Sequence, residues 1–257
     1  MLACFALYAT ILVPSLGAHL LIGDGGLQAM PLAYAATCAA VSALAVLAVW
    51  LLTTRVDRRP FREVGLVVTS ASLPALALGL LLSGAVVVLV NCPLAAAGLS
   101  RDIETTSWSQ LAAALPSVLA AAFLLQGFPE ELFFRGYVLS MFAARPVTAI
   151  AVSALVFGSL HLISGAGQQN VLERLIYLGP AAAFGLLAGS LVLLTRSLWS
   201  AVGVHAGFHV GSAVASVFGS GDGPANWIAQ TVVYAAVAAV VLALARARLR
   251  EPLVIDR

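Results

Sequence analysis

The chain has 257 residues, of which 61% are hydrophobic and only 9% are charged, and its formal net charge is +2. A soluble globular domain carries about 25% charged residues, so this chain lacks the polar side chains that would cover a water-facing surface. The composition excludes an ordinary soluble domain and predicts a protein that lies in a lipid bilayer. So small a net charge gives no support for a nucleic-acid partner.

Apolar stretches follow one another along the whole chain. A membrane-spanning helix needs about 20 consecutive apolar residues. Eight stretches are candidates, over residues 3–22, 30–54, 66–90, 109–128, 147–164, 172–195, 197–217 and 225–245. The first has no positively charged segment before it and no cleavage site after it, so it is expected to be retained. We therefore expect an all-α fold, a polytopic helical bundle of about eight transmembrane helices, with residues 1–257 forming a single integral membrane domain.

The arginines predict the orientation. All 13 basic residues are arginines, and most of them lie in alternate loops between the predicted spans or after the last span. These are Arg55, Arg58, Arg59, Arg62, Arg135, Arg145, Arg196, Arg246, Arg248 and Arg250. If the spans alternate in direction, these segments and both termini share one side, which the positive-inside rule assigns to the cytoplasm. We expect an integral protein of a bacterial plasma membrane with both termini cytoplasmic.

An acidic pair interrupts the apolar sequence near the end of the fourth span. A charged side chain at the centre of a membrane helix costs at least about 2.5–3.5 kcal/mol, so such residues are functional candidates. In the pattern E-E-x-x-x-R, Glu131 and Arg135 are four residues apart, so Arg135 is expected to neutralise Glu131. Glu130 points about 100° away and has no local partner. Glu130 is therefore the candidate general base or acid; the alternative is a solvated charge cluster at a helix end.

Histidines occur late in the fifth span and within the seventh. The fifth span contains the pattern F-x-x-x-H, formed by Phe157 and His161. A single histidine on an apolar helix is more often a hydrogen-bonded core residue than a catalyst. In the seventh span, His205 and His209 are four residues apart and share one face. Two histidines on one face of a membrane helix are difficult to explain as core packing, which favours a functional role.

Small residues beside these histidines predict close helix packing. Gly158 lies between Phe157 and His161, and Gly203 and Gly207 have the small-x-x-x-small spacing on the seventh span. Such residues allow the backbones of two membrane helices to approach each other.

Two chemistries fit this set of residues. In the first, Glu130 takes a proton from water, His161 orients that water, and His205 with His209 stabilises the oxyanion of a peptide carbonyl. In the second, His161, His205, His209 and Glu130 bind zinc, with Glu130 as a ligand or as the base. Both routes hydrolyse an acyl bond.

Taken in order, the three motifs resemble those of the CAAX prenyl protease and bacteriocin-processing (CPBP, Abi-type) family of intramembrane proteases. The resemblance covers residues 105–217, a catalytic core in the C-terminal half, and extends to the segment 62–66. It implies an all-helical fold, catalytic roles for Glu130 and His161, and an oxyanion-stabilising role for His205. Glu131, Arg135 and Phe157 are then expected to support the site. The family pattern ends in Asn or Asp where this chain has His209, which can also donate a hydrogen bond.

The resemblance favours a glutamate-activated water that requires no cofactor, with zinc as the alternative. It implies a membrane-associated protein or peptide as substrate, including a lipidated or C-terminally sorted one, and the lipid bilayer as surroundings. A non-catalytic immunity or scaffold protein and a proton-coupled transporter are the other candidate classes. A transporter usually has two related halves, whereas the polar residues here lie in the second half alone.

Overall fold

The computed structural model describes residues 31–163, 167–250 and 255. The described chain is almost entirely helical, which confirms the predicted all-α class. Its α-helices are α2 (Pro31–Leu51), α3 (Ser72–Ala96), α4 (Trp108–Leu119), α5 (Phe128–Glu131), α6 (Leu139–Met141), α7 (Pro146–Leu160), α8 (Val171–Thr195), α9 (Leu198–Ala215) and α10 (Pro224–Leu244). The π-helical segments are η1 (Leu52–Val56), η3 (Ala120–Gly127) and η4 (Leu132–Val138), and the 3₁₀ segments are η2 (Phe61–Val64), η5 (Ser216–Phe218) and η6 (Arg246–Arg250). Two short strands, β1 (Arg101–Glu104) and β2 (Ser220–Asp222), pair antiparallel.

Six helices in the described residues are long and apolar enough to cross a membrane. They are Leu32–Val56, Ser72–Ala96, Trp108–Met141, Val171–Thr195, Leu198–Phe218 and Pro224–Leu244. The predicted number of about eight is not confirmed. The predicted first span, 3–22, lies outside the described residues. The predicted fifth span corresponds to α7, which has only 15 residues and is shorter than a full span.

The predicted end of the fourth span at residue 128 is wrong. Helix continues from Trp108 to Met141 through α4, η3, α5, η4 and α6, so the acidic pair lies inside a 34-residue helical run. Pro129 has no backbone N–H and cannot make the usual i→i−4 bond. The chain adopts π-helical geometry on both sides of α5, and the Phe128 N–H bonds to the Phe123 carbonyl. Ser42 of α2 donates to the Leu124 carbonyl at 2.6 Å, which supplies an additional partner within this run.

Close packing of glycines joins α3 to α9. A Cβ atom on Gly203 would clash with the backbone of Leu76, and one on Gly207 would clash with the backbone of Leu80. The predicted small-residue packing of the seventh span is therefore confirmed, with α3 as the partner helix. Gly158 of α7 likewise allows contact with Ala182 of α8, because a Cβ there would lie 3.0 Å from the Ala182 Cβ.

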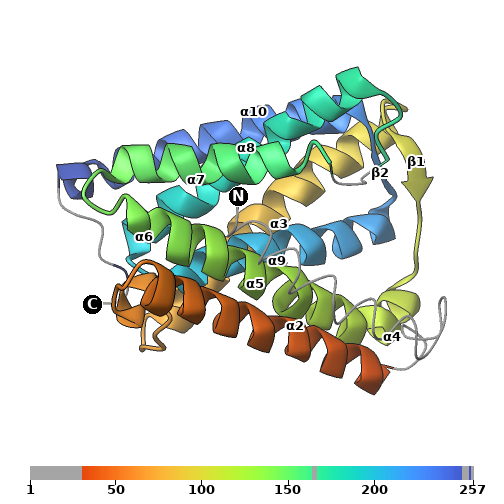
Figure 1. The fold of residues 1–257 in the computed structure, drawn as a ribbon. Coiled ribbons are helices and arrows are strands. Elements are labelled where there is room, and N and C mark those ends of the chain that lie inside the picture. Colours follow the sequence, from red (N-terminus) through yellow and green to blue (C-terminus); the bar gives the residue numbers. More distant parts are fainter. Residues whose placement is uncertain (1–30, 164–166, 251–254, 256–257) are drawn as a thin grey trace.

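Helix α8 packs against α7 and α10, which lie beside it along one side of the bundle (Figure 1), and it also contacts α9. Leu187, Leu191 and Leu193 of α8 are fully buried. In the most apolar stretch of α8, 61% of the residues are buried, a larger share than in the other five candidate spans among the described residues. Helix α8 therefore provides the buried surface against which the neighbouring helices pack, and this packing positions their polar residues.

The two ends of the bundle carry different charges. The β1–β2 pair lies at one end, and η6 together with the end of α2 lies at the other (Figure 1). Arginines of η1 and η6 and the loops after α2, α6 and α8 gather at the η6 end, as the alternating loops predicted. The prediction is wrong for Arg135, which is fully buried within the helical run because it pairs with Glu131. The β end carries Asp102 and Glu104 on β1 and Asp222 on β2.

Candidate active site

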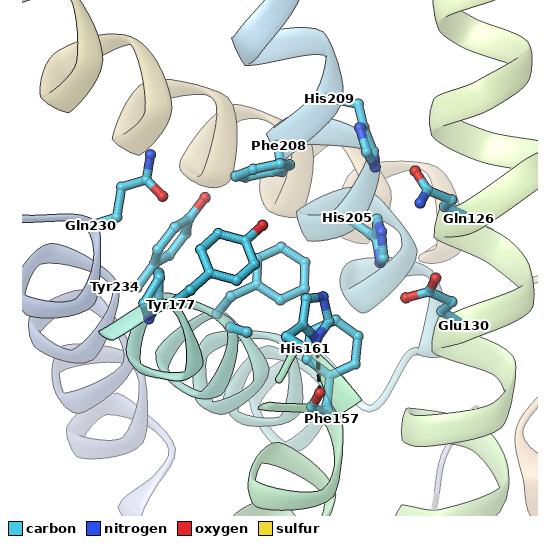
Figure 2. A pocket seen from close by; sticks show the side chains of 13 residues that line it. Gln126, Glu130, Phe157, His161, Tyr177, His205, Phe208, His209, Gln230 and Tyr234 are labelled. Carbon is cyan, nitrogen blue, oxygen red and sulfur yellow. Dashed lines mark hydrogen bonds between the residues drawn. The ribbon is translucent and has the colours of Figure 1, made fainter. Parts of the chain in front are cut away.

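The four predicted catalytic residues and Phe157 line one cavity inside the bundle, whereas Glu131 and Arg135 do not line it. The cavity has a volume of about 130 Å³, enough for several water molecules. Its lining comes from the long helical run, α7, α8, α9 and α10 (Figure 2). The lining residues are Gln126, Glu130, Phe157, His161, Tyr177, Pro180, Ala181, Phe184, His205, Phe208, His209, Gln230 and Tyr234. The fold thus brings Glu130, His161, His205 and His209 together from three separate helical segments.

Glu131 and Arg135 form the predicted ion pair, and both side chains are fully buried. Arg135 Nη1 donates to Glu131 Oε1 at 2.9 Å. The structure adds a third member, because His205 Nδ1 lies 3.0 Å from the same Glu131 oxygen. A carboxylate oxygen can only accept, so the neutral or charged ring donates its Nδ1 proton to Glu131. Glu131 therefore links the long helical run to α9 and fixes the orientation of the His205 ring.

Unlike Glu131, Glu130 lies with its carboxylate at the cavity surface. Its carboxylate points into the cavity toward His161 and His205 (Figure 2). No described residue forms a hydrogen bond or ion pair with it, whereas the neighbouring Glu131 is bound twice. The predicted division is thus present in the structure: one carboxylate is held by protein groups and the other faces the cavity.

Phe157 and His161 form the second part of the site. The ring centroids of Phe157 and His161 are 4.6 Å apart, and the Arg135 guanidinium lies 4.8 Å from the Phe157 centroid. His161 Nδ1 lies 2.8 Å from the Phe157 carbonyl oxygen. Because a carbonyl can only accept, Nδ1 carries the proton, and Nε2 carries the lone pair in the neutral ring. Phe157 therefore holds His161 in one orientation through both its backbone and its ring.

The turn after α7 is also held in place. The backbone N–H groups of His161 and Leu162 bond three residues back, to Gly158 and Ser159, at 3.0 and 3.2 Å. Arg174 of α8 donates to the Leu162 carbonyl at 3.1 Å. These bonds end α7 at the cavity, so His161 stands at the terminus of a short helix instead of within a full span.

His205 and His209 stack on the same face of α9, with ring centroids 5.4 Å apart and planes inclined by 21°. Both line the cavity (Figure 2). His209 Nε2 is buried and has no hydrogen-bond partner among the described residues. A buried imidazole nitrogen without a partner is costly unless it meets a bound molecule or water, so this atom marks a ligand position.

Four polar residues of the cavity were not predicted. Gln126 precedes Glu130 by four residues, so helical spacing alone placed both on one face. Tyr177, Tyr234 and Gln230 come from α8 and α10. The Tyr234 hydroxyl hydrogen-bonds to Ser83 Oγ at 2.8 Å. A tyrosine in an apolar helix carries no distinctive sequence signal, because its ring is as compatible with lipid as with a cavity.

The zinc alternative requires a converging set of ligands. The described residues contain no group of three or more His, Cys, Asp or Glu side chains arranged to hold a metal ion. Nδ1 of His161 and Nδ1 of His205 contact protein oxygens, as the second ring nitrogen of metal-binding histidines commonly does, so these contacts do not distinguish the two chemistries. Because no ligand group converges among the described residues, no step of the proposed reaction is assigned to a metal.

Together these features define a class: a polytopic helical membrane protein with a carboxylate- and histidine-lined cavity in its interior. Residues 112–211 match the family described as type II CAAX prenyl endopeptidase Rce1-like. This match confirms the family resemblance, and it runs from α4 into α9, across all three motifs. It lies within the predicted core 105–217, whose exact limits stay a prediction. The match supports a membrane protease. Neither the curated proteins nor the solved structures give a match.

Proposed function

We propose that this protein is an intramembrane endopeptidase that cleaves a membrane-associated protein or peptide with a water molecule activated by Glu130 and His161. The observation that carries the proposal is the position of Glu130. Its carboxylate is not bound by any described residue and faces His161, His205 and His209 across a cavity of about 130 Å³. A carboxylate in such a position can act as a general base toward water held in the cavity.

The reaction follows from these positions. Glu130 takes a proton from water, and the Nε2 lone pair of His161 accepts a hydrogen bond that orients the same water. The hydroxide attacks the carbon of the scissile peptide bond and produces a tetrahedral oxyanion. The Glu130 carboxylic acid then returns the proton to the peptide nitrogen, and the carbon–nitrogen bond breaks. The products are a carboxylic acid and an amine.

His205 and His209 are assigned to the oxyanion. Glu131 accepts the Nδ1 proton of His205, so Nε2 of this ring acts as a donor when it also carries a proton, and the Glu131 carboxylate stabilises that imidazolium. His209 provides a further donor from its buried Nε2, replacing the Asn or Asp of the family pattern. Two fixed donors near a developing negative charge stabilise it strongly, because a cavity without bulk water screens the interaction weakly.

The test uses purified full-length protein in detergent with a library of membrane-anchored peptides. Glu130→Gln keeps the size of the side chain but removes the base, so cleavage should fall by about 10²–10⁴-fold. His161→Ala should also be strongly impaired. Glu63→Gln is the matched control: it removes one carboxylate from the η6 end, far from the cavity, and should cleave as wild type does.

His209 allows a sharper test of the oxyanion role. His209→Asn retains a hydrogen-bond donor and should keep kcat within about 10-fold of wild type, whereas His209→Ala should lose about 10²–10³-fold. Equal rates for both variants would contradict the role.

A chelator distinguishes the metal-free mechanism from the zinc-dependent one, because cleavage by the metal-free mechanism continues in its presence. Loss of cleavage with a chelator and recovery of cleavage with added zinc would instead support the zinc-dependent alternative. The protease proposal fails if two results are obtained together. Folded wild type cleaves no peptide, and Glu130→Gln accumulates in the membrane and gives the same cellular phenotype as wild type. These results would favour a scaffold or immunity protein.

A further inference from the structure

A second cavity adjoins the active-site cavity on its β1–β2 side. It has a volume of about 420 Å³ and shares four lining residues with the first cavity: Tyr177, Phe208, His209 and Gln230. Its remaining lining includes both strands and the adjacent ends of α3, α9 and α10. The two cavities are therefore adjacent, and together they extend from Glu130 toward the β end of the bundle. We call the second cavity the acidic vestibule.

Three carboxylates line the outer part of the acidic vestibule: Asp102, Glu104 and Asp222. None of them forms an ion pair with a residue in the described ranges. The nearest arginine is already engaged, because Arg101 binds Glu173 through two hydrogen bonds of 3.0 and 3.2 Å and lies over the Trp227 ring. The vestibule therefore carries carboxylates that form no ion pair with described residues, and burial raises the pKa of one of them, Asp222, against the attraction of Arg101.

The deeper wall offers a hydrogen-bonding group to a ligand. Trp227 lines the vestibule and is only 1% exposed, and its indole N–H interacts with the Asp222 carboxylate beyond ideal hydrogen-bond geometry. His209 Nε2, at the junction of the two cavities, is buried without a partner among the described residues. The unpartnered Nε2 of His209 is separate from the acidic cluster and indicates a polar ligand group where the two cavities meet.

We infer that the acidic vestibule binds a positively charged segment of the substrate, rich in Lys or Arg, that flanks the bond cleaved near Glu130. The inference rests on the proposed protease function. It explains why carboxylates without an ion-pair partner among the described residues line the cavity next to the one that holds the candidate catalytic groups. Coulombic attraction to such a segment would increase kcat/KM, and salt would weaken that attraction at the exposed end.

The test compares three membrane-anchored peptides with the same apolar cleavage segment, flanked by three Lys, three Gln or three Glu residues. Each set is made with the charged residues on either side of the segment. At low salt, wild type should cleave the Lys peptide at least about 10-fold more efficiently than the Glu peptide, which corresponds to about 1.4 kcal/mol. The ratio should shrink at high salt.

The triple variant Asp102→Asn, Glu104→Gln, Asp222→Asn should reduce the Lys-to-Glu ratio to within about 3-fold. The changes are conservative for the backbone. Asp102 has a φ of 48°, which Asn tolerates, and Asn at 222 keeps the Oδ1 atom that accepts from the Gly223 N–H at 2.8 Å. The control Glu63→Gln removes a carboxylate at the opposite end of the bundle and should keep the wild-type ratio.

The outcomes separate this inference from the proposed function. If wild type cleaves all three peptides at equal rates, or if the triple variant keeps the full Lys preference, the vestibule assignment fails and the protease proposal stands. If wild type cleaves none of these three peptides but cleaves members of the peptide library, the vestibule inference alone fails. If it cleaves neither, and Glu130→Gln behaves in cells as wild type does, the proposed function fails, and the vestibule inference fails with it. A preference that Glu63→Gln abolishes as completely as the triple variant would also overturn the vestibule assignment.

Discussion

Arg135 contacts two parts of the candidate site at once. It donates to Glu131 and lies over the ring of Phe157, which in turn holds His161. The ion pair follows directly from the sequence, because residues four apart on a helix are neighbours. The contact between Glu131 and His205 does not, because 74 residues separate them and packing alone brings them together. Local spacing thus predicted half of this cluster, and the family resemblance predicted that the remaining residues would meet.

Removing Arg135 should destabilise the protein strongly. Arg135→Met leaves the fully buried Glu131 carboxylate without its cation, a change that costs about 3–5 kcal/mol when one partner of a buried pair is lost. The exposed pair between Arg59 and Glu63 provides the comparison, and Glu63→Gln should cost about 0–1 kcal/mol. Unfolding of each variant in detergent, induced by heat or by denaturant, measures both losses of stability. Equal losses would show that the buried pair contributes no more than a surface pair.

The long helical run shows where sequence reasoning fails for an element. The charged residues from Glu130 to Arg135 lower the local hydropathy, so the pattern predicted that the span ends at residue 128. The helix instead continues to Met141, because Glu131 and Arg135 neutralise each other inside the bundle. The π-helical segments around Pro129 were equally invisible, since they arise from how the chain accommodates a missing N–H. Such segments are frequent at functional sites.

The contact between α3 and α9 positions both His205 and His209. Gly79 of α3 has no room for a side chain, because a Cβ there would clash with the backbone of Ser200. Gly79→Leu should therefore destabilise the fold by at least about 1–3 kcal/mol and reduce cleavage by moving α9. Ala77→Leu adds a similar side chain two residues away on an exposed part of α3 and should have little effect. Thermal unfolding and peptide cleavage, measured for both variants, test this. Equal stability of the two variants would mean that α3 and α9 can separate without cost.

At the scale of the whole molecule, apolar length predicted the class of fold and six of the spans. It did not predict that α7 ends at His161 after 15 residues, since a short helix that borders a cavity has the same composition as a crossing one. Nor did hydropathy reveal the acidic vestibule, whose carboxylates come from β1 and β2, which lie 116 residues apart between Glu104 and Ser220. Charge patterning predicted that the arginines would gather at one end, because helices of alternating direction return every second loop to the same side.

The orientation in the membrane remains a prediction that cysteine labelling can test. Arg59 and Arg248 lie at the η6 end, whereas Glu104 lies on β1 at the opposite end. In a background with Cys4, Cys38 and Cys92 replaced by Ser, Arg248→Cys should react with an impermeant thiol reagent only after the cells are opened, because the arginine-rich end is expected to face the cytoplasm. Glu104→Cys should react in intact cells. Arg59→Cys, which lies in a different loop, should likewise react only after the cells are opened. Labelling of position 59 or 248 in intact cells would place the arginines outside. The acidic vestibule would then open to the cytoplasm, and the substrate's charged segment would have to lie there as well.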